Sequence, residues 1–373
     1  MARKFGQKKE VSISPLSYNI GLAGISGVGK STLVKNVCEK LVGDQGYLML
    51  DIGKESGHSC IDGIMSETIE DWEKLDEVLD EIIENRTSDD WKDLKVVAFD
   101  TLDELFTLAE EFAIKRWNRQ NPDRRCTSVN DLAGGFGRGL DMVIDLVLKR
   151  IWSLKEVGIS FIVITHTKTK DIEDPITQQT YQVITANMSQ RYFNAIKSKL
   201  DILGVCYIDR EIIKSKIEGR KDIKGKDITR NIVASEARKI SFRSDDFNLD
   251  SKCRFQSVVN EIPLDADAFI EAITNAIKAE QSKSGKSYEE TKAEQDKAEA
   301  ARMKEIAEAE SKNKAKKEVD AVITKINDYL KENKSDVAKI KPILAKCKEF
   351  GVKTPSELTT LEDALAVLEV IEA

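Results

Sequence analysis

The sequence has few of the residues that build metal clusters and disulfide frameworks. Six cysteines are scattered over 373 residues without a C-x-x-C pair. The two histidines, His58 and His166, are too few and too isolated for a zinc site. No run approaches the roughly 20 apolar residues of a membrane span, and Met1 to Phe5 lacks the apolar segment of a signal peptide. We therefore expect reduced, mostly buried thiols in a cytoplasmic protein that does not enter a membrane.

An excess of positive charge is also missing, because the formal net charge is −7. This argues against a globally basic DNA-coating protein, although local basic patches can still bind phosphates. Apolar residues make up 41% of the chain, which is enough for a packed core. A length of 373 residues exceeds what one core usually holds. The expected organisation is one large domain with a smaller appendage.

The most informative stretch is a complete G-x-x-x-x-G-K-S phosphate loop between an apolar run, Ile20 to Ala23, and a helical pattern. Its glycines let successive backbone N–H groups converge on phosphate oxygens at a helix N-terminus. We expect Lys30 to reach the β- and γ-phosphates of ATP or GTP and Ser31 to bind Mg²⁺. A bland glycine-rich turn would not require Lys-Ser after its last glycine. The residues expected to contact the nucleotide are Gly24, Ile25, Ser26, Gly27, Val28, Gly29, Lys30, Ser31 and Thr32.

A second apolar strand, Lys95 to Asp100, ends in a carboxylate. This is the pattern of a buried parallel strand that carries an acid at its carboxyl end. We expect Asp100 to hold Mg²⁺ through its water shell, opposite Ser31. The alternative is an acid at a solvated strand end. Asp103 and Glu104 begin the next helical pattern, where carboxylates also favour the helix dipole, and they are secondary candidates for catalysis.

The remaining patterns alternate between strand and helix. Further strands are predicted over Tyr47 to Asp51, Ile159 to Ile164 and Ile202 to Ile208, and helices over Thr68 to Arg86, Leu102 to Asn118 and Leu140 to Lys155. Period-two alternation within Arg210 to Lys239 predicts a hairpin with a basic side. Together these elements predict an α/β fold with a mostly parallel sheet covered by helices.

Two polar segments are candidates for the chemistry around the phosphate loop. Thr165 and His166 follow a buried strand, so either can sense the γ-phosphate by a hydrogen bond, or His166 can be a bystander. The basic, glycine-rich segment Arg119 to Gly139 can clamp a nucleic acid strand through arginine and aromatic contacts. A mobile surface loop is an equal alternative for that segment.

The two ends of the chain differ in composition from the middle. Residues 1–15 are basic and polar and predict a flexible arm, and 16–280 form the core domain. Residues 281–318 carry ten basic and nine acidic side chains and predict a solvated helix or linker. Residues 319–373 regain apolar periodicity, and Thr354 and Pro355 are a predicted helix start. We expect a small helical C-terminal module there.

Tyr18 to Ile273 resembles a group of phage-encoded RecA-like P-loop ATPases, the phage nucleotide-binding proteins that include single-strand annealing and recombination ATPases. The likeness rests on the phosphate loop, the Asp100 strand, and four further motifs in order. These are Gly135-Phe136-Gly137-Arg138-Gly139, Phe161 to Ile164 with Thr165-His166, Lys199-Leu200-Asp201, and Lys252-Cys253-Arg254-Phe255.

This resemblance implies a RecA-like core that binds ATP and Mg²⁺ at the interface of a ring or filament of identical subunits. It also implies action on single-stranded DNA beside single-strand-binding or other replication proteins, in the host bacterial cytoplasm. The positions that look like DNA-facing ones are Arg124, Arg125, Arg138, Lys168 and Lys170. The two lysines can equally reach a neighbour's γ-phosphate. Arg254 can complete a neighbour's site or form a structural salt bridge.

One departure concerns the catalytic base. RecA-type enzymes place a glutamate after the second strand, and this sequence offers only Glu55, slightly displaced. We expect DNA-stimulated ATP hydrolysis, with Glu55 polarising the water. The main alternative is a nucleotide-switched scaffold or loader that recruits replication proteins. A small-molecule kinase is a third possibility, but no second substrate pocket is readable in the sequence.

Overall fold

The structure is a computed structural model that describes residues 10–53, 57–173, 177–221, 227–243, 251–284, 286–334 and 336–372. The chain divides into two compact units. The first comprises Met1–Ile83 and Asp89–Glu299, and the second comprises Glu84–Ser88 and Ala300–Ala373.

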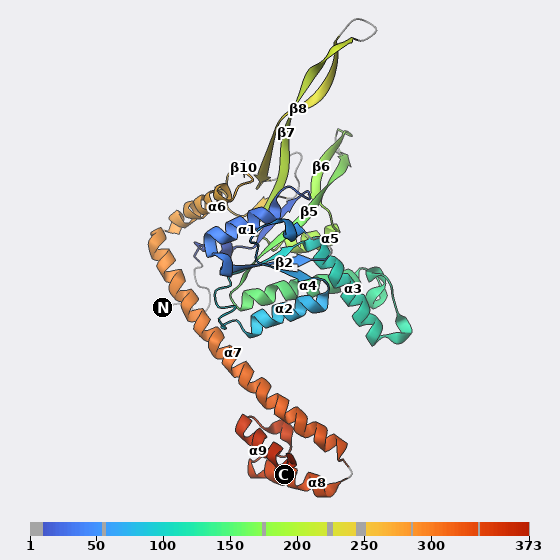
Figure 1. Cartoon of the computed structure of the whole chain (residues 1–373), viewed down its shortest axis with the longest axis vertical. Helices are drawn as coiled ribbons and strands as arrows, with labels where there is room; N and C mark the ends of the chain where they lie inside the picture. The colour runs from blue at the N-terminus through green and yellow to red at the C-terminus, as the bar shows by residue number, and fades with distance from the viewer. Residues whose placement is uncertain are drawn as a thin grey trace. The chain divides into compact units, whose positions relative to one another are not determined.

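The first unit is built on one sheet with the strand order β10-β8-β7-β1-β5-β4-β2-β3 (Figure 1). The strands of this path are β1 (Ile20–Gly24), β2 (Tyr47–Ile52), β3 (Ser66–Ile69), β4 (Val96–Asp100), β5 (Ser160–Glu173), β7 (Ile202–Lys221), β8 (Asp227–Ser241) and β10 (Glu261–Pro263). The strands from β7 to β3 run parallel, and β8 is antiparallel to both of its neighbours, β7 and β10. The expected α/β fold with a mostly parallel sheet is confirmed.

Helices cover both faces of this sheet (Figure 1). On one face lie α1 (Lys30–Val42) and α6 (Ala266–Gln281), and on the other lie α2 (Trp72–Glu84), α3 (Leu102–Gln120), α4 (Arg138–Glu156) and α5 (Gln190–Lys197). Strand β4 shows how its sequence serves both faces. Val97 and Phe99 pack into the core under α2 to α4, whereas Val96 and Ala98 pack into the core under α1 and α6. A strand buried on both faces is therefore apolar along its length, as β4 is from Val96 to Phe99.

Four strands were not predicted from the sequence, namely β3, β6, β9 and β10. Ser66–Ile69 pairs with β2 as β3, so the helix expected from Thr68 begins only at Trp72. The Asp71 carboxylate accepts a hydrogen bond from the Lys74 backbone N–H at 2.8 Å and so caps that helix. Strand β6 (Thr180–Ala186) pairs with the outer half of β5. The short β9 (Lys252–Cys253) pairs with β7.

Two hairpins extend from the carboxyl ends of the parallel strands, β5/β6 in green and β7/β8 in yellow-green (Figure 1). The pairing of β7 with β8 begins at Val205 and Ser241 and continues to Lys221 and Asp227. The hairpin predicted over Arg210 to Lys239 is therefore present as a long two-stranded ribbon, with register shifts between Glu211 and Ile212 and between Lys216 and Lys221. Residues 222–226, between the two strands, lie outside the described residues.

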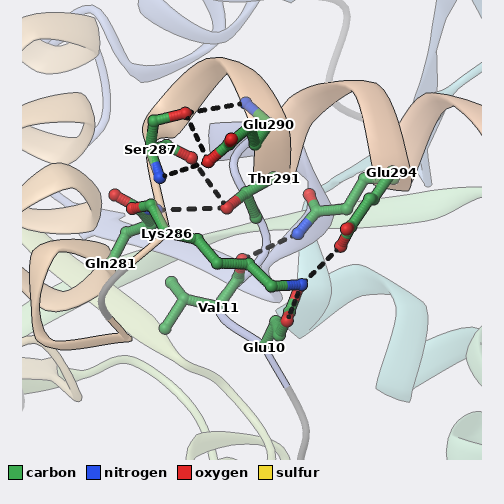
Figure 2. Close-up of polar contacts among 9 residues, drawn as sticks. Glu10, Val11, Gln281, Lys286, Ser287, Glu290, Thr291 and Glu294 are labelled. Atoms are coloured by element: carbon green, nitrogen blue, oxygen red, sulfur yellow. Dashed lines mark hydrogen bonds and ion pairs between the residues drawn. The ribbon is translucent and has the colours of Figure 1, made fainter.

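The start of the described chain is held against the beginning of α7 (Tyr288–Glu332), where the sequence predicted a flexible arm through residue 15. Lys286 Nζ lies 2.7 Å from both the Glu10 and Glu294 carboxylates (Figure 2). The Gln295 side-chain amide donates to the Val11 carbonyl at 2.8 Å and accepts from the Ile13 N–H at 2.9 Å. These contacts fix the path of residues 10–13 along the helix.

The second unit contains the rest of α7 together with α8 (Val337–Glu349) and α9 (Leu361–Glu372). Its own apolar core includes Val322, Ile326, Ile343 and Val367. The segment Glu84–Ser88 belongs to this unit because the Thr87 N–H and Oγ donate to the Glu310 carboxylate at 3.0 and 2.6 Å. Residues 288–318 of the charged segment and the start of the apolar module thus share one continuous helix, α7.

Candidate functional site

The phosphate loop Gly24–Ser31 joins β1 to α1 at the carboxyl edge of the parallel strands. Gly29 precedes α1 with a φ of 110°, a backbone conformation that glycine adopts far more readily than other residues. The buried Lys30 ammonium donates to the carbonyl oxygens of Gly24 at 2.9 Å and Ile25 at 3.0 Å. A helix N-terminus attracts anions and Lys30 adds a full positive charge, so the loop is suited to phosphate groups.

The two residues expected to hold Mg²⁺ lie in contact with each other. Ser31 Oγ donates to Asp100 Oδ2 at 2.5 Å. Ser31 comes from the first turn of α1, and Asp100 ends β4, two strands away from β1 across β5. Mg²⁺ takes one or two carboxylates beside phosphate oxygens and waters. This pair of oxygen ligands beside a phosphate loop therefore fits a Mg²⁺–nucleotide complex.

His58 also lies at this point, although the sequence gives it no role because it is too isolated for a zinc site. It is buried, and its Nε2 lies 3.0 Å from Asp100 Oδ2. Its Nδ1 lies 4.0 Å from the carboxylate of Asp51, which lies opposite Asp100 near the end of β2. Burial raises the pKa of Asp51, with Asp100 adding to the rise and His58 opposing it. The one sequence signal for His58 is its position shortly after a strand that ends in an acid.

Asp103 connects α3 to the polar end of the buried part of β5. Its Oδ1 accepts from Thr165 Oγ and from the His166 N–H, both at 3.3 Å. Its Oδ2 lies 3.0 Å from His166 Nδ1. Burial alone would raise the pKa of Asp103, but the hydrogen bonds and charge of His166 outweigh burial and hold this pKa below its usual range. Thr165 and His166, the expected γ-phosphate sensors, are therefore oriented by a residue that the sequence marked only as secondary.

The expected catalytic base, Glu55, lies outside the described residues. Glu104, the other secondary candidate, packs against Gly53 at the exit of β2. A Cβ on Gly53 would stand 2.5 Å from Glu104 Oε2, and the φ of 83° at Gly53 also favours glycine. A second carboxylate therefore lies close to the segment that leads to Glu55.

The structure separates the residues predicted to face DNA into different regions. Lys168 and Lys170 are exposed on the outer half of β5, a few residues beyond His166. Arg138 is exposed at the start of α4, and its guanidinium donates to the Ala133 carbonyl at 3.5 Å. Arg124 and Arg125 are exposed beyond the far end of α3, one helix length or about 28 Å from its start near Asp100.

Arg254 lies at the opposite edge of the sheet from the phosphate loop. Its Nε is 3.2 Å from the carboxylate of Asp201, which immediately precedes β7. The structural salt bridge that the sequence left open for Arg254 is thus present within one chain. Completion of a neighbouring subunit's site by Arg254 stays a prediction.

The loop, the buried lysine and the Ser31–Asp100 pair together define a P-loop protein that binds nucleoside triphosphates. The family model described as an AAA domain (AAA_24) matches residues 17–239, more than half of the chain. The chain therefore belongs to this AAA domain family, and membership indicates a nucleotide-binding ATPase that typically uses Mg²⁺. A comparison with curated proteins finds no match. In the described part of the chain, no helix is both long enough and apolar enough to cross a membrane.

Proposed function

We propose that this ATPase is a RecA-like, phage-encoded protein that acts on single-stranded DNA in recombination, annealing or replication. The observation that carries the proposal is the continuity of β5. Its inner part brings Thr165 and His166 to Asp103 beside the metal-binding pair, and its outer part exposes Lys168 and Lys170. At about 3.3 Å per residue, the lysines lie only about 7 to 17 Å along the strand from Thr165 and His166. DNA bound by these lysines would therefore contact the same strand, β5, that carries the candidate γ-phosphate sensors Thr165 and His166, and could change their positions.

The side chains at the loop have distinct tasks in this proposal. Lys30 neutralises charge on the β- and γ-phosphates, and Ser31 and Asp100 are the residues that would hold Mg²⁺. The ion, when bound, supplies further stabilisation of the negative charge that develops during phosphoryl transfer. Asp103 keeps Thr165 and His166 oriented at the same edge of the sheet. Glu55 remains the proposed residue for polarising the attacking water.

The test is steady-state ATP hydrolysis measured with and without single-stranded oligonucleotide. We expect the oligonucleotide to stimulate the wild type. A variant with both Lys168→Glu and Lys170→Glu should keep its basal rate, lose most of the stimulation, and bind DNA with a weaker dependence on salt because phosphate contacts are lost. Lys149→Glu, an exposed lysine on α4, is the matched control and should behave as wild type. Full stimulation of the double variant would remove β5 from the DNA site.

A nucleotide-switched scaffold or loader is the second candidate, and the separate second unit favours it. This unit has its own apolar core, and Val337 at the start of α8 is 72% exposed. Such a module can bind a partner protein without contributing to hydrolysis. A wild-type protein whose ATPase rate does not respond to single-stranded DNA would favour this second function over the first.

A further inference from the structure

Arg238, near the end of β8, contacts the phosphate loop although it lies far from the loop in sequence. Its Nη1 donates to the Val28 carbonyl at 3.3 Å and stands 3.7 Å from where a Cβ on Gly29 would be. Leu264 Cδ2 lies 3.1 Å from the same point, and the Leu264 N–H donates to the Arg238 carbonyl at 2.9 Å. Arg238 and Leu264 therefore both pack beside the loop at the start of α1.

The charge of Arg238 is not neutralised by a neighbour in the ranges that the structure describes. Other cations at the base of the ribbon are paired there. Lys239 lies 2.8 Å from Asp209 and 2.7 Å from Glu261, and Arg210 lies 2.9 Å from Glu236. No carboxylate within those ranges comes as close to Arg238. A guanidinium has five N–H donors, and the Val28 carbonyl takes one of them. A permanently charged group with spare donors beside a phosphate loop is suited to bind phosphate oxygens.

The strand order places Arg238 and the metal-binding pair on opposite sides of the loop. From β1, Asp100 lies two strands away in one direction, on β4, and Arg238 lies two strands away in the other, on β8. The γ-phosphate is expected on the side of Asp100 and Ser31, because these are the residues that would hold Mg²⁺ beside the terminal phosphates. Arg238 then lies on the side of the loop where the α- and β-phosphates, which ADP and ATP share, are expected.

We propose that Arg238 is a nucleotide-binding residue that contacts a phosphate group common to ADP and ATP, on the side of the loop away from Asp100. The proposal rests on nucleotide binding at the phosphate loop and not on action on DNA. Because the contact is the same before and after hydrolysis, it contributes to affinity and leaves the chemical step unchanged.

The experiment is titration of ADP and of a non-hydrolysable ATP analogue into Arg238→Gln, followed by steady-state kinetics. Affinity for both nucleotides should fall about 10-fold or more and by the same factor, as expected for a lost charge-assisted hydrogen bond. KM for ATP should rise while kcat stays within about twofold. Arg238→Lys keeps the charge without the planar fork and should be intermediate. Arg230→Gln, an exposed arginine on the same strand, is the control and should match wild type.

Unchanged ADP affinity in a folded Arg238→Gln protein would overturn the inference and leave Arg238 a structural partner of Val28. A loss confined to the ATP analogue would also overturn it, because Arg238 would then act on the γ-phosphate side. If the wild type bound neither nucleotide, the ATPase assignment itself would fail and the inference with it. Thermal unfolding without nucleotide separates a binding defect from a folding defect, and a well-folded Arg238→Lys keeps the test decisive.

Discussion

The two strands that flank the phosphate-loop strand differ in what they bring to the site. On one side, β5 runs on into the β5/β6 hairpin, and its polar positions Thr165 and His166 are held by Asp103 near the Ser31–Asp100 pair. On the other side, β7 runs on into the β7/β8 ribbon, whose returning strand places Arg238 against the loop carbonyl of Val28. Both extensions leave the same edge of the sheet (Figure 1).

This difference assigns separate tasks to the two sides. The β5 side carries groups whose hydrogen bonds can depend on the γ-phosphate, so changes there should alter turnover. The β8 side carries a positive charge beside the shared phosphates, so changes there should alter affinity for ADP and ATP alike. Mutations on the β5 side should therefore change kcat, and mutations on the β8 side should change nucleotide affinity.

The largest effect on nucleotide binding or turnover is expected in the phosphate loop, which lies between the β5 side and the β8 side. Lys30→Ala removes the buried ammonium from the loop and should lower nucleotide binding or turnover by at least about 100-fold. Lys35→Ala on the same helix breaks only a partly exposed ion pair with Glu39, and its rate should stay near wild type. Hydrolysis at the wild-type rate by Lys30→Ala would show that nucleotide is turned over elsewhere.

A smaller effect is expected from the β5 side alone. Asp103→Asn keeps the size of the side chain but cannot accept all the hydrogen bonds that Thr165 and His166 give to the carboxylate. We expect kcat to fall about 10-fold while ADP affinity stays within about twofold. Asp145→Asn on α4 is the control. An equal loss of ADP affinity in Asp103→Asn would mean that β5 does not act on the γ-phosphate side.

The smallest effect is a pH dependence of stability that belongs to the β5 side. Since the folded state holds the pKa of Asp103 below its usual range, Asp103 stabilises the fold fully above about pH 4, and this contribution is lost as pH falls through the lowered pKa. Asp103→Asn should therefore lose less unfolding free energy than wild type between about pH 5 and pH 3. Denaturant unfolding at several pH values measures this, and parallel curves for the two proteins would contradict the assignment.

The parts of this site that were readable from the sequence are the local ones. The loop Gly24–Ser31 combines a short motif with its flanking strand and helix, and Asp100 ends a strand that is apolar throughout because both its faces are buried. In such segments the candidate nucleotide-binding residues also determine the local structure. The basic ribbon was likewise predicted, because period-two alternation is a local signal.

The parts that were missed depend on contacts between distant segments. His58 meets Asp100 across 42 residues of sequence, and Arg238 meets Val28 across 210. Strand β3 has four residues and only Ile69 is buried, so it forms through pairing with β2 and not through a pattern of its own. No periodicity in a single sequence records such pairings. The carboxyl edge of the sheet nevertheless indicates where such contacts between distant residues are to be expected.

The most direct measurement is a comparison of Asp103→Asn, Arg238→Gln and the double variant, with ADP affinity and kcat determined for each. The account predicts that Asp103→Asn changes kcat alone, that Arg238→Gln changes affinity alone, and that the double variant shows both changes at nearly their single-variant size. Separated sites with no shared partner add in this way within about 0.3–0.5 kcal/mol. If either single variant moved both quantities, or the double variant departed strongly from additivity, the division of the site into two sides would be wrong.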